Sequence, residues 1–193
     1  MTITYRYGGG LYVNITNRCS NSCEFCIRKL ADSVGDVGSL WLSREPSREE
    51  IIRDILTHDL SNYNEMVFCG YGEPTERLND LLWVCAELKR TGPQVIRVNT
   101  NGQASLIAGY DTAPRFSKLV DRLSISLNAP NADEYYSLCK PAFGLDAYQG
   151  VLDFITKVKE YVPDVVLSVV AGTTDAGKCR EVAKKMGLQL RVR

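Results

Sequence analysis

The chain has 193 residues, and its 23 lysines and arginines balance 23 aspartates and glutamates. Hydrophobic residues make up 45% and charged residues 24%, which is ordinary for a globular domain and excludes a disordered chain. A neutral chain has no overall attraction to nucleic acid or to anionic membranes. Residues 1–10 lack the apolar core of a signal peptide, so none is expected, and no apolar run approaches the roughly 20 residues of a membrane span. We therefore expect a single cytoplasmic domain over residues 1–193.

Six short apolar runs alternate with helical patterns, and each run predicts a β-strand. One helix is expected to begin at a capping box of Ser47 and Glu50, and Asn131 and Asp146 are candidate caps of two more. The alternation predicts parallel strands joined by right-handed crossovers. Six such units fit either a doubly wound sheet or an open (β/α)₆ partial TIM barrel, since a complete barrel takes about 250 residues. The runs span residues 11–16, 65–69, 95–99, 119–127, 165–171 and 188–192.

Unusual residues follow five consecutive strands, at the point where each strand ends. Because the carboxyl ends of parallel strands meet at one edge of a sheet, these residues are expected to form one site there. The stretches are 19–26, 70–74, 100–102, 126–128 and 171–172.

Three of the seven cysteines, Cys19, Cys23 and Cys26, form a C-x₃-C-x₂-C pattern. An odd number of cysteines in a chain expected in a reducing compartment favours metal chemistry over a disulfide framework. A structural zinc site normally has four ligands, so a zinc-binding interaction module would also need Cys69 or His58. Three thiolates instead suit a [4Fe–4S] cluster with one iron left open, since complete ligation uses four. Both possibilities stay open on spacing alone.

The cysteine pattern, with Phe25 before its last member, resembles the signature of the radical SAM superfamily. The sequences Gly-Tyr-Gly-Glu-Pro at 70–74 and Ser-Leu-Asn at 126–128 strengthen the resemblance. More narrowly, the chain resembles the small radical SAM proteins associated with TatD-type nucleases, through residues 11–19, 68–74, 126–129 and 191–193. The resemblance implies the open (β/α)₆ partial barrel, with Cys19, Cys23 and Cys26 holding one [4Fe–4S] cluster. It also implies an enzyme that reductively cleaves S-adenosylmethionine (SAM) to a 5′-deoxyadenosyl radical, which abstracts hydrogen from an unidentified substrate.

The same resemblance implies contacts with the cofactor. Phe25 would pack against the cluster or the adenine, Gly70 and Gly72 would let the backbone approach the methionine moiety, and Glu73 would accept from its ammonium group, with Pro74 stiffening the turn. A solvated turn carboxylate is the alternative for Glu73. Tyr71 stands where many members have glycine and is expected to point away from the cofactor.

Later strand ends would complete the site. Ser126 and Asn128 are expected on one side of their strand, where they could bind the ribose or the carboxylate, although a simple turn would also place them there. Either Val169 or Val170 is expected to face inward and contact adenine. Thr100 and Asn101 could line the same cleft.

Two further features remain as candidates. Cys139 could be a substrate-facing thiol, whereas Cys69, Cys85 and Cys179 suit packing. The segment of residues 27–46 is long enough to predict a functional loop that caps the site or binds substrate, with Trp41 or Leu42 as its anchor.

The resemblance also implies partners. A low-potential electron donor, flavodoxin or ferredoxin, would be required, and the subgroup implies a TatD-like nuclease. A laterally open barrel could accept a substrate as large as a nucleic acid or a protein. Alternatives within the superfamily are an activase of a glycyl-radical enzyme and a deazaguanine-type synthase.

Overall fold

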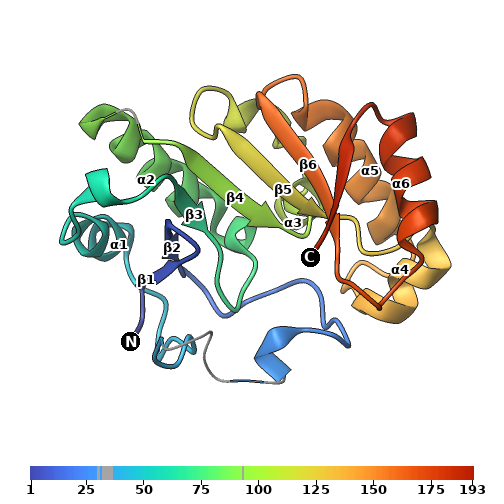
Figure 1. Ribbon diagram of the computed structural model, residues 1–193, viewed down its shortest axis with the longest axis horizontal. Coiled ribbons are helices and arrows are strands. Elements are labelled where there is room, and N and C mark those ends of the chain that lie inside the picture. The colour runs from blue at the N-terminus through green and yellow to red at the C-terminus, as the bar shows by residue number, and fades with distance from the viewer. Residues whose placement is uncertain (30, 32–36, 93) are drawn as a thin grey trace.

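The computed structural model describes residues 1–29, 31, 37–92 and 94–193. Its centre is a seven-stranded sheet in which the strands follow one another in chain order (Figure 1). Strands β2 to β7 pair in parallel, whereas β1 pairs antiparallel with β2. The sheet is open, because β1 and β7 lie at its two ends. The strands are β1 (Thr4–Tyr7), β2 (Gly10–Val13), β3 (Met66–Phe68), β4 (Ile96–Thr100), β5 (Arg122–Ser126), β6 (Asp164–Val169) and β7 (Gln189–Val192).

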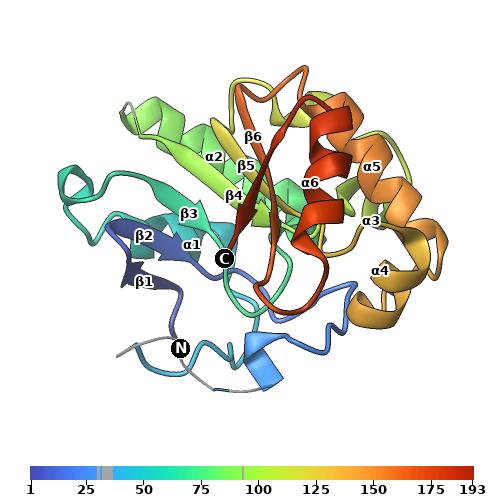
Figure 2. The ribbon, with the colours of Figure 1, turned by 45° about the vertical axis from the view of Figure 1, so that its right-hand side comes forward.

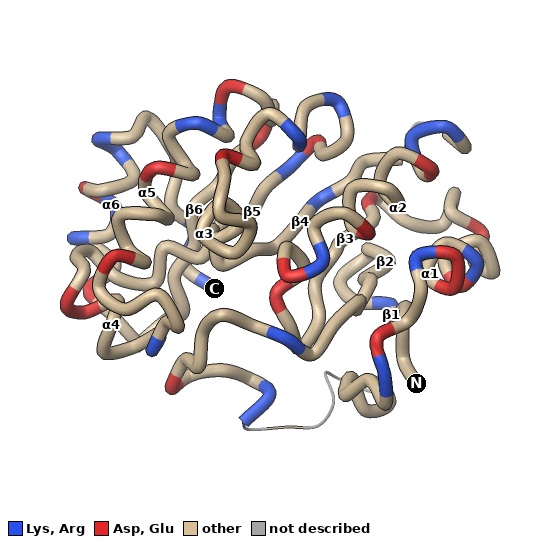
Figure 3. Tube along the Cα trace, turned by 180° about the vertical axis from the view of Figure 1, so that it is seen from behind, with Lys and Arg blue, Asp and Glu red and all other residues tan. Residues whose placement is uncertain are grey.

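The α-helices lie along the outer, convex side of the curved sheet (Figures 1 and 2). Acidic and basic residues are interspersed over these helices and the outer loops rather than gathered by sign (Figure 3). In the described ranges, every helix is too short or too polar to cross a bilayer. The helices are α1 (Arg48–Ile55), α2 (Leu78–Thr91), α3 (Ala104–Ala108), α4 (Ala132–Cys139), α5 (Asp146–Val158) and α6 (Ala176–Lys185).

Capping side chains mark the start of α1, α4 and α6. The predicted capping box is present at α1, since the Glu50 N–H donates to Ser47 Oγ (3.2 Å) and the Ser47 N–H to Glu50 Oε2 (2.8 Å). Asn131 caps α4 as predicted. The prediction of Asp146 as a cap is wrong, because Asp146 is already the first residue of α5 and Leu145 precedes it without a capping side chain.

The six predicted strands are present as β2 to β7, and the open partial barrel is confirmed. The antiparallel strand β1 was not predicted. It folds back onto β2 through Gly8 and Gly9, whose φ angles of 53° and 83° fit a tight hairpin turn.

The two faces of the sheet differ in chemistry because successive side chains point to opposite sides. Apolar residues such as Phe68, Val98 and Ile125 face the helices and are fully buried. The concave face is polar, and its paired positions include Asn99 beside Ser124. The helices thus cover the apolar face, and the polar face is left to line a site.

Candidate active site

The cysteine loop, residues 19–26, follows β2 at the carboxyl edge of the parallel strands. Backbone hydrogen bonds fasten this loop to the end of α4. The Glu24 N–H donates to the carbonyl of Leu138 at 3.0 Å, and Asn21 pairs with Pro141 in an isolated antiparallel bridge. The protein itself therefore sets the position of the loop.

The thiols of Cys19, Cys23 and Cys26 are free and half-buried. Burial, with the carboxylate of Glu73 nearby, raises the pKa of Cys19 to about 12. A hydrogen bond from Cys139 lowers the pKa of Cys23. Among the described residues, no three Cys, His, Asp or Glu side chains already stand at the mutual spacing of metal ligands. The three thiols thus lie on one loop, but they are farther apart than the ligands of one metal centre.

A network of buried polar side chains holds the cysteine loop in place through hydrogen bonds to Ser20 and Asn21. The Gln103 Nε2 donates to Asn21 Oδ1 (2.8 Å) and to the Tyr135 hydroxyl (2.9 Å), and Asn21 Nδ2 donates to the same hydroxyl (3.2 Å). Asn101 Nδ2 donates to Ser20 Oγ at 2.9 Å. Sequence reasoning missed Gln103 and Tyr135, because only the fold brings α3 and α4 to the loop.

The two glycines of the turn after β3 have a packing reason of their own. A Cβ on Gly72 would lie 2.3 Å from the carbonyl oxygen of Thr16 and 2.6 Å from that of Arg18. A Cβ on Gly70 would lie 2.0 Å from Asn14 Oδ1. The glycines therefore let this turn press against the chain that leads into the cysteine loop.

Glu73 is 4% exposed, so its alternative as a solvated turn carboxylate is wrong. Its Oε1 accepts from the Thr75 N–H (3.0 Å), from Thr75 Oγ1 (2.7 Å) and from Thr100 Oγ1 (2.8 Å). Its Oε2 accepts from the Asn101 N–H at 2.6 Å. Burial raises the pKa of Glu73 against these bonds. The carboxylate ties the end of β4 to the buried turn in which Pro74 begins a 3₁₀ segment.

Asn128 lies beyond β5, which ends at Ser126, so a shared side for these two residues stays a prediction. Ser126 lies on the concave side and its Oγ accepts from Arg193 Nη2 at 2.8 Å. Asn128 has a left-handed φ of 58°, which breaks the alternation, and its Nδ2 lies 3.5 Å from Cys139 Sγ. Its Oδ1 is buried without a hydrogen-bond partner.

Phe25 was expected beside the cluster or the adenine, and Val169 or Val170 beside the adenine. Phe25 is half-buried and packs against the main core. Val169 is 1% exposed and lies on the helix-facing side of β6 with Val165 and Leu167, so Val169 as an adenine contact is wrong. By alternation, Val170 takes the concave side.

The model of the radical SAM superfamily matches residues 13–185. The chain belongs to this superfamily. The match includes the cysteine loop and every strand from β3 to β6. No curated protein matches the chain. As a radical SAM protein the chain is an enzyme, and the superfamily uses a [4Fe–4S] cluster together with SAM.

Solved radical SAM structures share the partial-barrel fold. A radical SAM methyltransferase from Sphaerobacter thermophilus has a TM-score of 0.66 and 19% identity, covering 98% of this chain and 57% of its own. TYW1 with a lysine–pyruvate adduct bound has a TM-score of 0.64 and 16% identity, with coverages of 96% and 65%. The anSMEcpe protein with bound AdoMet has a TM-score of 0.59 and 18% identity, with coverages of 94% and 50%. The chain spans less than two thirds of each of these proteins.

The donor set of this radical SAM protein fits an iron–sulfur cluster. Soft thiolates are the preferred ligands of such clusters, and the cysteine loop offers three free thiols at the edge where the strands end.

His58 lies too far from these thiols to be a fourth ligand. It precedes β3 at the opposite, amino edge, and its ring forms hydrogen bonds with Thr4 Oγ1 (2.9 Å) and the Tyr63 hydroxyl (3.2 Å). His58 is therefore half-buried in a local network rather than solvated.

Cys139 does not face substrate, so that prediction is also wrong. It is the last residue of α4 and is fully buried. Its thiol donates to Cys23, and this contact strongly raises the pKa of Cys139. Cys85 and Cys179 lie in the core as predicted, whereas Cys69 is only half-buried at the end of β3.

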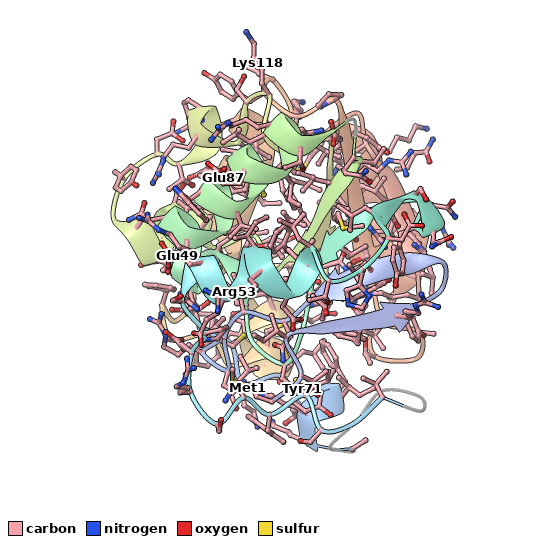
Figure 4. All side chains as sticks on the ribbon, turned by 90° about the vertical axis from the view of Figure 1, so that its left-hand side faces the viewer. Met1, Glu49, Arg53, Tyr71, Glu87 and Lys118 are labelled. Atoms are coloured by element: carbon pink, nitrogen blue, oxygen red, sulfur yellow. The ribbon has the colours of Figure 1, made fainter. Side chains whose placement is uncertain are left out.

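The segment after the cysteine loop covers the hairpin side of the site. Residues 30 and 32–36 of the predicted 27–46 loop lie outside the described residues. Leu42 is 6% exposed and Leu40 1%, whereas Trp41 is 40% exposed, so the leucines are the buried anchors. Tyr71, which is labelled in Figure 4, is buried with Tyr5 and Leu40 in a small separate cluster.

Sequence reasoning missed an opening on the concave face, which we call the tyrosine–arginine hollow. It encloses about 280 Å³. Tyrosines of the β1–β2 hairpin form one wall, arginines of β4 and β7 form the other, and the turn after β3 closes the carboxyl edge. The lining of the hollow includes Tyr5, Tyr7, Tyr12, Arg97, Arg191 and Arg193.

Proposed function

We propose that Cys19, Cys23 and Cys26 hold one [4Fe–4S] cluster and that the enzyme cleaves SAM reductively to abstract hydrogen from a substrate. The cluster would supply the electron that breaks the S–C5′ bond of SAM, giving methionine and a 5′-deoxyadenosyl radical. One observation carries this proposal. A family-matched loop with three free thiols is held at the carboxyl edge of the sheet, beside the turn organised by Glu73.

Glu73 would act by shaping the turn. Glu73 Oε1 accepts three hydrogen bonds and Oε2 accepts one, and the side chain is only 4% exposed. An ammonium group could therefore reach only the remaining acceptor site on Oε2, and the burial of Glu73 restricts that approach. We infer that the backbone carbonyls of the turn at 70–74 receive the SAM ammonium, while Glu73 holds Thr100 and Asn101 in place.

The remaining strand ends would bind the rest of SAM. Ser126 lies on the concave side, and the buried Oδ1 of Asn128 has no hydrogen-bond partner, which suits a hydroxyl or amino donor from a ligand. Val170 and Phe25 would offer apolar contact to adenine. A site closed in this way would exclude water from a reactive radical.

The electron would come from flavodoxin or ferredoxin, and the resemblance to the TatD-associated group makes a TatD-like nuclease the proposed functional partner. A glycyl-radical-enzyme activase, a deazaguanine-type synthase and, of another class, a zinc-binding module remain the alternatives. An activase predicts transfer of the radical to a partner protein, so a glycine-centred radical signal on that protein would distinguish it.

The test is anaerobic reconstitution with iron and sulfide, followed by an assay for 5′-deoxyadenosine with dithionite and SAM. We expect about four irons per chain and 5′-deoxyadenosine formation. Cys23→Ala should lose both, whereas Cys179→Ala, which removes a buried cysteine on the outer helix α6, should keep both. A protein that binds about one zinc and no iron would overturn the proposal in favour of the zinc module.

A further inference from the structure

The tyrosine–arginine hollow lies next to the carboxyl edge but extends away from it. Gly70 and Cys69 line its edge, and Tyr12 and Arg97 lie further along the concave face. Resting on the function proposed above, we propose that this hollow is the substrate site. We further propose that it takes a small anion with an aromatic body, bound through a carboxylate or a phosphate.

Charge is the first argument. The other arginines on this face are neutralised, since Arg97 pairs with Glu65 at 2.8 Å and Arg122 pairs with Asp164 at 3.0 Å. No acidic side chain among the described residues pairs with Arg191 or Arg193, and the Arg193 guanidinium donates to the neutral Ser126 hydroxyl at 2.8 Å. Two guanidinium groups on one strand end are thus left with positive charge and free donors. Such groups recognise carboxylate and phosphate oxygens with good geometry.

The facing wall is aromatic. The rings of Tyr5 and Tyr12 lie 5.3 Å apart, and Tyr7 meets Tyr12 edge to face at 5.4 Å. Tyr7 is 52% exposed, so this wall still has ring surface to cover. Flat aromatic groups pack well on such rings at low entropic cost.

Unsatisfied polar atoms on the same face give a third argument. Asn99 Oδ1 and Ser168 Oγ are buried without a hydrogen-bond partner. Asn99 lines the hollow, and Ser168 pairs in register with Arg191. Buried polar atoms are rarely left unpaired, so these two suit donors or acceptors brought by a ligand.

The volume limits what can enter. The volume of about 280 Å³ lies just below the roughly 300–1,000 Å³ of common small-molecule pockets. A small molecule fits, or one side chain or one base of a larger substrate. The anionic group would reach the arginines while the aromatic body lies against the hairpin.

The test is calorimetric titration of the reconstituted enzyme, kept anaerobic without reductant, with and without saturating SAM. The probes are phenyl phosphate, benzoate, inorganic phosphate and the neutral benzyl alcohol. We expect one aromatic anion to bind at least about tenfold tighter than benzyl alcohol and than inorganic phosphate, because charged hydrogen bonds and ring contact both contribute. The comparison of phenyl phosphate with benzoate identifies which anionic group the arginines prefer.

Arg191→Gln and Arg193→Gln should each weaken binding of that probe about tenfold. Arg180→Gln is the matched control, because Arg180 is exposed on α6 and should leave binding unchanged. The proposal is overturned if no aromatic anion binds, if benzyl alcohol binds equally well, or if the two variants bind like the wild type. It is also overturned if saturating SAM abolishes binding, since the arginines would then belong to the SAM site. No SAM cleavage is needed in this test, so its failure and that of the proposed function are distinguishable.

Discussion

Gly72→Ala tests whether the turn after β3 positions the start of the cysteine loop. The added Cβ would lie 2.3 Å from the Thr16 carbonyl oxygen, where real Cβ contacts stay above 3.0 Å, so the backbone must shift by at least about 0.7 Å. Because both close contacts are backbone atoms, no side chain can rotate away. Overpacking of this kind costs about 1–3 kcal/mol, and we expect the upper end, about 3 kcal/mol.

For a chain of this size, 1 kcal/mol shifts the melting temperature by roughly 2–4 °C. We therefore expect Gly72→Ala to melt about 6–12 °C below the wild type by circular dichroism. Reconstituted iron should fall too, because the shift moves the chain that leads into Cys19. Gly38→Ala is the control, since its Cβ would meet nothing closer than 3.8 Å. Wild-type melting and iron content in Gly72→Ala would refute the reasoning.

Three further predictions follow from particular hydrogen bonds. Tyr135→Phe removes the buried hydroxyl that two amide groups share, and it should lower the free energy of unfolding by about 1–3 kcal/mol in urea, whereas an unchanged value would mean that water replaces it. Cys139→Ala removes a hydrogen bond to Cys23, so the midpoint potential of the bound cluster should fall in an EPR-monitored titration; an unmoved potential would contradict this. Arg44 and the Ser47 N–H lower the pKa of Glu50 from 4.5 to about 2, so its contribution to stability should be lost as the pH falls between these values. Glu50→Gln should therefore flatten the acid limb of a melting-temperature profile, and an unchanged limb would contradict it.

Local signals predicted the elements well because each depends on near neighbours. The capping box at Ser47 needs only Glu50, three residues away, and the helix stripes need only a 3.6-residue period. The unpredicted strand β1 had such a signal too. Gly8 and Gly9 lie between two tyrosine-containing runs, which is a hairpin pattern. The pattern is harder to identify because Gly10 extends the glycine run into the second strand.

It was harder to predict which face of the sheet each side chain occupies, because this depends on the elements that cover each face. The end of β6 is apolar at both Val169 and Val170, so alternation of polarity is absent there. The position of Asn128 needed its left-handed φ, which nothing in the neighbouring residues demands. The sequence pointed to residues 191–193 only through a resemblance, and the fold was needed to place Arg191 and Arg193 in one hollow with the tyrosines of the β1–β2 hairpin.

Gly70 shows why a motif can be right while the reason given for it is incomplete. The resemblance explains the glycine by room for methionine, but the structure shows that Asn14 already occupies that side, with its Nδ2 bound to the Leu40 carbonyl at 2.7 Å. Asn14 thereby connects the turn after β3 to the segment that follows the cysteine loop. A side chain at position 70 would disturb this connection even without any ligand. The glycine is therefore required for the packing of the turn against Asn14, and the same residue also lines the tyrosine–arginine hollow.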